Sequence, residues 1–296
     1  MKTLTKAFTV IMMVVFLAAC GGGGDKVTIS SLTYTETKIL AEMYRELIEQ
    51  ETDVEVEMKH DIATSPVVIE GMQNGDIDIS TQFTGTSVSS FEEIENPQDS
   101  DATLEQMREL FAGDDFKLEV LDNLGYANTY VFTVREDIAE EYDLETVSDV
   151  AEYAEEFSAG FDTAWLERED DGYPAFKETY GFEFGDTSPM EISLVYDAVK
   201  NEEFDIVLAY STDPRIVSYD LQMLEDDENF FPPYDAVPVI REEVLDDHPE
   251  IKEALEPLIG AFDEEEIAAL SGKVDNDGEE VKDVAVEYLK EKGLIE

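Results

Sequence analysis

Apolar runs and helical hydrophobic repeats alternate in the N-terminal third of the chain. Residues 27–29, 54–58 and 77–79 have the apolar or alternating patterns that are typical of strands. After Thr35, which can cap a helix, apolar residues recur at helical spacing, at Ile39, Leu40, Met43, Tyr44, Leu47 and Ile48. A second helix is expected over 65–74, opened by a proline and ended by a glycine. This alternation predicts a mainly parallel sheet covered by helices.

A second series of the same kind begins at residue 130. Residues 130–134 form a strongly apolar run, and Thr146 to Asp149 resemble a capping box. The further elements that the pattern predicts are helices at 149–156 and around 192–196, strands at 206–209 and 236–240, and helices from Pro249 onward.

The length of the chain also favours two lobes, since about 270 residues after an export signal exceed the usual size of one domain. We expect lobe I to comprise residues 27–130 and 235–296, and lobe II residues 131–234. The carboxyl edges of the two sheets are then the expected place for a ligand.

The N-terminal end has the pattern of an exported lipoprotein. Two lysines precede an apolar run that is short for a membrane span, and small residues lead to Cys20, the only cysteine of the chain. Residues 1–19 are therefore predicted to be a signal peptide. Cys20 is the expected lipidation site, and residues 20–26 form a glycine-rich tether. This predicts a protein anchored by lipid to the extracellular face of the membrane.

The charge of the chain is extreme: 19 lysines and arginines stand against 73 aspartates and glutamates, for a formal net charge of -54. Such a charge excludes nucleic acid as a partner. The content of 43% hydrophobic residues is too high for a disordered chain, so we predict a folded domain with a very acidic surface. Our hypothesis is that this surface is adapted to high salt, which screens its self-repulsion.

Signatures of catalysis and of metal binding are scarce. The two histidines, His60 and His248, stand in a strand end and a turn, and neither has a metal-binding partner nearby in the sequence. The stretch 275–278 resembles a calcium loop only faintly, because the required ligand spacing is missing. The sequence therefore predicts a protein that is not an enzyme and that carries no metal or other cofactor.

Four aromatic residues stand out because they lie in polar, turn-like surroundings near the ends of apolar strands. They are Phe83, Tyr130, Tyr210 and Tyr234. Taken one at a time, each is better explained as a core residue, since the chain has 16 Phe, 13 Tyr and 1 Trp. Position alone does not decide between a core role and a ligand-binding role.

Several motifs in order along the chain resemble the glycine betaine/carnitine/choline-binding proteins of osmoprotectant ABC importers. They are TETKIL at 35–40, GDIDI at 75–79, FTGT at 83–86, YGF at 180–182, AYSTD at 209–213, LEDD at 224–227 and PPYDA at 232–236. The resemblance extends from about residue 26 to the end. It implies the type II periplasmic-binding-protein fold, in which two α/β lobes enclose a ligand cleft.

The resemblance also implies the ligand and its site. By motif position, Phe83, Tyr130, Tyr210 and Tyr234 would form an aromatic box around a quaternary ammonium group. Such a group has no N–H to donate, so aromatic faces attract it in place of hydrogen bonds. Thr86 and Arg168 would hold a carboxylate, and Asn128 and Trp165 are further candidate contacts.

Two positions depart from the family pattern. Phe83 stands where tyrosine is usual, and Leu32 stands where some members have a lysine that contacts the ligand. The first departure keeps the ring face and loses a hydroxyl. The second removes a donor for a carboxylate, and both bear on which osmoprotectant is preferred.

The resemblance implies two partners, a small quaternary-ammonium solute and the ABC permease, and we expect a monomer. Three alternatives stay open. The same fold could serve a polyamine or an amino acid. The chain could be a lipid-anchored hydrolase that uses paired carboxylates, although no pair stands out among 73. It could also be a surface lipoprotein whose partner is another protein.

Overall fold

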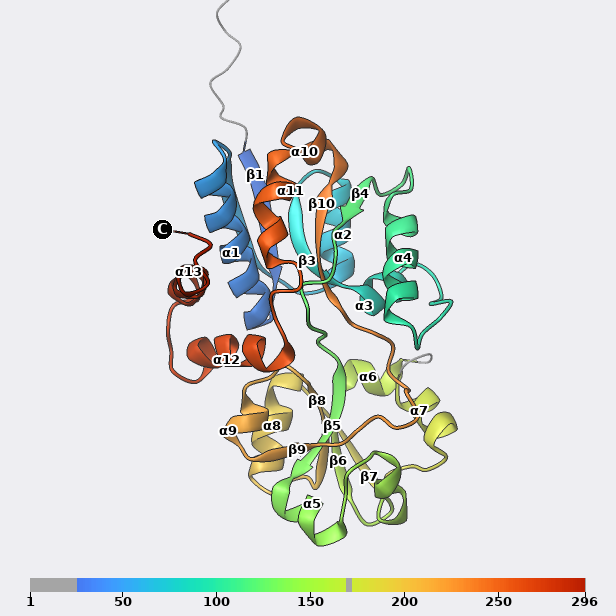
Figure 1. The fold of residues 1–296 in the computed structure, drawn as a ribbon. Helices are drawn as coiled ribbons and strands as arrows, with labels where there is room; N and C mark the ends of the chain where they lie inside the picture. Colours follow the sequence, from blue (N-terminus) through green and yellow to red (C-terminus); the bar gives the residue numbers. More distant parts are fainter. Residues whose placement is uncertain (1–25, 169–171, 296) are drawn as a thin grey trace, which may run out of the picture.

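The structure is a computed structural model that describes residues 26–168 and 172–295 (Figure 1). The predicted signal peptide, Cys20 and most of the tether lie outside the described residues. Two five-stranded mixed sheets, each with its own helices, form two lobes. The predicted α/β class with two lobes is confirmed. Within the described residues, no helix is both long enough and apolar enough to cross a membrane.

The sheet of lobe I has the strand order β2-β1-β3-β10-β4. Its strands are β1 (Lys26–Leu32), β2 (Glu55–Ile62), β3 (Ile79–Phe83), β10 (Ala236–Arg241) and β4 (Leu118–Val120). β1 is parallel to β2 and to β3, while β10 is antiparallel to both of its neighbours. β10 therefore runs against the other four strands, and the strand predicted at 77–79 lies further along, at 79–83.

The helix α1 (Thr35–Glu51) packs on this sheet through the face that the hydrophobic repeat predicts. Its repeat residues, from Ile39 to Ile48, are all buried. Tyr34, and not Thr35, is the N-cap residue, and the Thr35 hydroxyl donates to Asp275 instead. The other helices of lobe I are α2 (Ser65–Gln73), α3 (Thr84–Ser89), α4 (Ser100–Phe111), α10 (Glu242–Asp247), α11 (Glu250–Leu255), η2 (Glu256–Leu258), α12 (Glu264–Asp275) and α13 (Val281–Glu291).

The sheet of lobe II has the strand order β7-β6-β8-β5-β9. Its strands are β5 (Tyr130–Arg135), β6 (Ser158–Asp162), β7 (Asp186–Met190), β8 (Ile206–Tyr210) and β9 (Leu221–Met223). Its helices are α5 (Glu136–Tyr142), η1 (Ser148–Glu152), α6 (Thr163–Glu167), α7 (Tyr173–Tyr180), α8 (Ile192–Lys200) and α9 (Arg215–Ser218). The capping box forms, with Asp149 and Thr146 hydrogen-bonded to each other's backbone N–H. The helix predicted at 149–156 is wrong, because only the short 3-10 helix η1 follows.

Two chain segments connect the lobes side by side. Residues 121–129 run antiparallel to residues 234–238, with backbone hydrogen bonds from Leu124 to Ala236 and from Asn128 to Tyr234. The buried carboxylate of Asp235 accepts from the side chains of Ser100 and Asn123. This pairing holds the two crossing segments side by side. One carries Tyr234, and the other leads into Tyr130. On another side, α12 lies at the junction of the lobes, where Asn276 donates to Ser218 (Figure 1).

Candidate functional site

Three of the four predicted box residues lie together where the lobes meet. Tyr130 is the first residue of β5 and Tyr210 the last of β8, and the antiparallel register pairs them. Their ring centroids are 5.0 Å apart, and Tyr234 stands edge-on to Tyr130 at 5.9 Å. A fourth ring, Phe231, lies 5.6 Å from Tyr130. Tyr130, expected at the end of lobe I, therefore belongs to the sheet of lobe II.

Phe83 lies in lobe I, at the end of the strand that pairs with the residues after Tyr234. It is the last residue of β3, is 5% exposed, and is paired in register with Ala236. Two residues on, the backbone N–H of Gly85 donates to the carbonyl of Pro233, at 2.9 Å. A Cβ on Gly85 would lie 2.5 Å from that carbonyl oxygen and 3.3 Å from the Tyr234 ring. Glycine at this position therefore lets α3, with the half-buried Thr86, pack against the segment of Tyr234.

Arg168 lies beside the ring group, at the C-terminal end of α6. Its guanidinium carbon is 5.1 Å from the centroid of the Tyr130 ring, and one of its nitrogens donates to the Tyr130 hydroxyl at 3.5 Å. Trp165, one turn earlier, has no exposed surface and packs against Phe132 and Phe161. Trp165 thus lies in the core of lobe II behind the rings, whereas Arg168 stands at their edge.

Asn128 connects the ring group to a residue that the sequence analysis missed. Its side-chain amide donates to the carboxyl of Glu36 at 2.6 Å, and its backbone N–H donates to the carbonyl of Tyr234. Glu36 is 4% exposed, and burial raises its pKa to about 7. An ionisable group held in this way next to a cleft is a candidate for a functional role.

Tyr34 is a second residue that the sequence analysis missed. Its ring meets Tyr210 edge-on, at 5.6 Å and 71°. Burial raises the pKa of Tyr34 and raises that of Tyr210 well above its usual range. Tyr34 and Glu36 directly follow β1, so the rule that ligands sit at the carboxyl ends of strands would have pointed to them.

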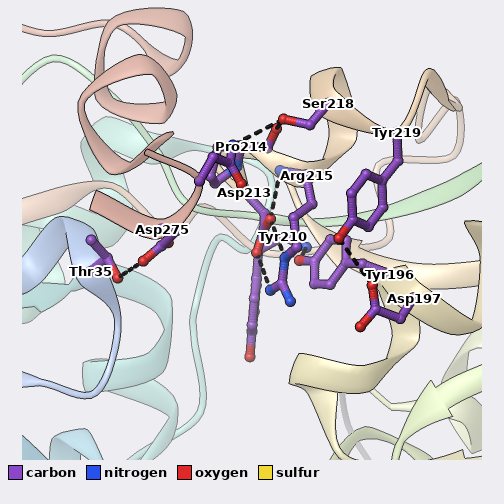
Figure 2. Close-up of polar contacts among 11 residues, drawn as sticks. Thr35, Tyr196, Asp197, Tyr210, Asp213, Pro214, Arg215, Ser218, Tyr219 and Asp275 are labelled. Atoms are coloured by element: carbon purple, nitrogen blue, oxygen red, sulfur yellow. Dashed lines mark hydrogen bonds and ion pairs between the residues drawn. The ribbon is translucent and has the colours of Figure 1, made fainter. Parts of the chain in front are cut away.

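A cavity of about 280 Å³ lies on the Tyr34 side of Tyr210, with walls from both lobes. Figure 2 shows part of its lining, with Thr35 and Asp275 on one side and the lobe II residues on the other. Arg215 pairs with Asp213 and lies over the Tyr196 ring, 3.9 Å from its centroid. The cavity is lined by Thr33, Tyr34, Thr35, Glu36, Asn128, Ile192, Tyr196, Tyr210, Thr212, Asp213, Pro214, Arg215, Ser271 and Asp275.

A larger hollow of about 620 Å³ lies elsewhere on lobe I, between Arg108, Leu118 and Lys252. All of its walls come from one lobe, so movement of the lobes cannot enclose a ligand there, and none of the predicted residues lines it. We therefore place the candidate site at the ring group between the lobes.

The histidines take structural positions in this arrangement. His60 is hydrogen-bonded to Ser31, which is 1% exposed, and His248 lies beside Glu250. Across residues 26–168 and 172–295, no group of three or more His, Cys, Asp and Glu side chains is arranged to hold a metal ion. The ring group itself offers aromatic faces, hydroxyls and the guanidinium of Arg168, and the neighbouring cavity adds the charged groups of Glu36, Asp213 and Arg215.

The chain belongs to a family of transport proteins. Residues 25–291 match the family described as the substrate binding domain of the ABC-type glycine betaine transport system. Members of this family are extracellular or periplasmic solute-binding proteins. The protein is therefore a substrate-binding protein of an ABC osmoprotectant importer, and the family resemblance seen in the sequence is confirmed.

Individual relatives agree with this assignment. The carnitine transport binding protein OpuCC of Listeria monocytogenes is 38% identical, over 100% of this chain and 98% of its own length. A glycine-betaine-binding protein of Pseudomonas aeruginosa is 29% identical, over 92% of this chain and 89% of its own. Among solved structures, a crystal structure of a glycine betaine/carnitine/choline ABC transporter has a TM-score of 0.83 at 37% identity. It covers 90% of this chain and 99% of its own.

Proposed function

We propose that the protein captures quaternary-ammonium osmoprotectants, such as glycine betaine, choline or carnitine, in an aromatic box and delivers them to its permease. The observation that supports the proposal is the grouping of Tyr210, from lobe II, and Tyr234, from a crossing segment, around the Tyr130 ring at the lobe junction. Rings attract a desolvated cation with about 2 kcal/mol or more each. The relatives named for carnitine and glycine betaine support the same ligand class.

Binding would involve a rearrangement of the rings. Tyr130 and Tyr210 contact each other directly in the described conformation, at 5.0 Å between centroids. A trimethylammonium group therefore needs these rings to separate, and Phe83 and Tyr234 would complete the box when the lobes come together around it. Capture and closure of the lobes are coupled in this scheme.

For a ligand with a carboxylate, we propose Arg168 and Thr86 as donors and Asn128 as a further contact, with the fully buried Trp165 outside direct contact. Arg168 already lies at the edge of the Tyr130 ring, and guanidinium suits a carboxylate. Leu32 is 2% exposed and is paired with Ile62 in the sheet, so it does not replace the family's lysine as a donor. This leaves fewer donors than in members with that lysine, which favours ligands held mainly through their ammonium group.

The proposal includes a lipid anchor at Cys20 on the extracellular face of the membrane and a monomeric protein that works with the permease. Its support is the sequence pattern of residues 1–20. Fractionation of cells that express the wild type and Cys20→Ala tests the anchor. The wild type is expected in the membrane fraction and the variant outside it, and equal partitioning would contradict the anchor.

A thermal-shift screen tests the ligand class. Glycine betaine, choline, carnitine, proline betaine and ectoine are each compared with a polyamine and with simple amino acids. Ligands that bind the native state raise the unfolding temperature, and the rise grows with the logarithm of the ligand concentration once that concentration exceeds the Kd. The proposal expects shifts with the quaternary amines. Shifts only with the polyamine or an amino acid would support the alternative ligand classes, and turnover of any bound solute would support a hydrolase.

A further inference from the structure

We infer that Glu36 is a positioning residue for the aromatic site: its buried carboxyl holds the two loops that carry Tyr130 and Tyr210 against lobe I, and solute binding is linked to the protonation of that carboxyl. The inference rests on the proposed function, because it concerns the same rings. It assigns a role to a residue outside the box.

The geometry ties one carboxyl to both tyrosines. Glu36 accepts a hydrogen bond from the side chain of Asn128 at 2.6 Å, and the Thr212 side chain faces the same carboxyl and lowers its pKa. Asn128 is two residues before Tyr130, and Thr212 is two residues after Tyr210. Because β5 and β8 are antiparallel and pair these tyrosines, both side chains lie at the same end of the strand pair. Glu36 therefore holds both strands at the end where the rings are.

The same contacts cross between the lobes. Glu36 lies in the first turn of α1 in lobe I, Asn128 lies in a crossing segment, and Thr212 lies in lobe II. Two residues before Glu36, the Tyr34 ring packs against Tyr210. Movement of lobe II away from α1 would break the Glu36 to Thr212 contact and admit water to the carboxyl.

Protonation of Glu36 depends on this enclosure. Burial is the largest cause that raises its pKa, to about 7, and the nearby Asp213 carboxylate adds to the rise. The side chains of Thr212 and Asn128, and the N-terminus of α1, act in the opposite direction. The ionisable groups that face it or share its cavity are Tyr34, Tyr126, Tyr196, Tyr210, Asp213, Arg215 and Asp275.

The direction of the linkage follows. The enclosed carboxyl has a raised pKa, and the hydrated carboxyl of a separated state would have a more ordinary one, so enclosure favours the neutral form. The stabilisation of the enclosed state by the neutral Glu36 carboxyl is complete at low pH and is lost as the pH rises through about 7. If the solute binds the enclosed state, its affinity falls by up to about tenfold between about pH 6 and about pH 8.

Calorimetric titration with glycine betaine over this pH range, in two buffers of different ionisation enthalpy, tests the inference. The wild type is expected to lose affinity as the pH rises and to show a binding heat that depends on the buffer. Glu36→Gln keeps the shape of the side chain and does not titrate, so its affinity should be nearly independent of pH. Glu42→Gln is the matched control, since Glu42 is also buried on α1 but pairs with Arg45, and it should follow the wild type.

If Glu36→Gln fails to fold, a second variant and a measurement without ligand still test the inference. Thr212→Val removes the hydroxyl that lowers the pKa of the carboxyl, so it should move the loss of affinity to higher pH. Without ligand, the wild type should lose thermal stability relative to Glu36→Gln from about pH 5 to about pH 8. A wild type that binds betaine with unchanged affinity at every pH contradicts the inference alone. A wild type that binds no quaternary amine contradicts the proposed function. In that case, the pH dependence of thermal stability without ligand, compared between the wild type and Glu36→Gln, tests the role of Glu36.

Discussion

Tyr130 and Tyr210 stand opposite each other as the first residue of β5 and the last residue of β8, with ring centroids 5.0 Å apart and a hydrogen bond between their hydroxyls. Strand register thus brings together two rings that are far apart in the sequence. Tyr234 joins them because its crossing segment runs beside the one that leads into Tyr130.

Tyr210→Ala should weaken binding of glycine betaine by about tenfold or more, since loss of one desolvated cation–π contact costs on the order of 1–2 kcal/mol. Calorimetry measures the change, and Tyr210→Phe, which keeps the ring, should lose much less. Tyr142→Ala, at the far end of lobe II on α5, is the control and should leave affinity unchanged. Wild-type affinity in Tyr210→Ala would remove Tyr210 from the box.

Gly85→Ala should disturb the site without changing any polar group. The new Cβ would lie 2.5 Å from the Pro233 carbonyl oxygen, which already accepts the Gly85 N–H, so the segment of Tyr234 must shift. Overpacking of this kind costs about 1–3 kcal/mol. We expect a lower unfolding temperature and about tenfold weaker betaine binding. Ser89→Ala, on the same helix, should change neither quantity, and a Gly85→Ala variant with wild-type affinity would contradict the packing argument.

Trp165→Phe separates a core role from a ligand-contact role. Trp165 has no exposed surface and packs against Phe132 and Phe161, so its replacement should lower the free energy of unfolding by on the order of 1–3 kcal/mol. Betaine affinity should change by less than about twofold, or less than about 0.4 kcal/mol. Denaturant unfolding and calorimetry on the same preparation give both numbers. A large affinity loss with unchanged stability would instead make Trp165 a ligand contact.

The acidic surface predicts a dependence of stability on salt. With a formal net charge of -54, self-repulsion destabilises the compact state at low ionic strength. The unfolding temperature should rise as sodium chloride increases from about 10 mM to about 2 M, because the screening length falls to a few ångströms. Equal stability across that range would refute the high-salt hypothesis.

Much of the fold follows from the sequence because its elements have strong periodicity. The repeat from Ile39 to Ile48 marks the buried face of α1, and the apolar run at residue 130 marks β5. The helix predicted at 149–156 failed although the local signals for it are present. The capping pair of Thr146 and Asp149 forms, and the buried Val150, Ala154 and Phe157 follow at helical spacing. Only η1 forms, and the carbonyl of Ala154 accepts from the distant backbone N–H of Gly185.

The site was predictable in part. Aromatic residues at strand ends indicated Tyr130, Tyr210 and Tyr234, which the structure brings together. Glu36 and Tyr34 were missed because their role depends on contacts with residues some 90 to 180 positions away, which no local pattern encodes. Trp165 was a candidate contact because it is near Arg168 in the sequence. On the five-residue helix α6, no periodicity shows which of the two faces the core.

The most direct test of the central claim is a calorimetric comparison of glycine betaine with glycine, which differ only in the three methyl groups on nitrogen. An aromatic box offers ring faces to a methylated cation and few acceptors for N–H groups, so we expect glycine betaine to bind at least about 100-fold more tightly. Glycine that binds as tightly as glycine betaine, or a protein that binds neither, would contradict the account.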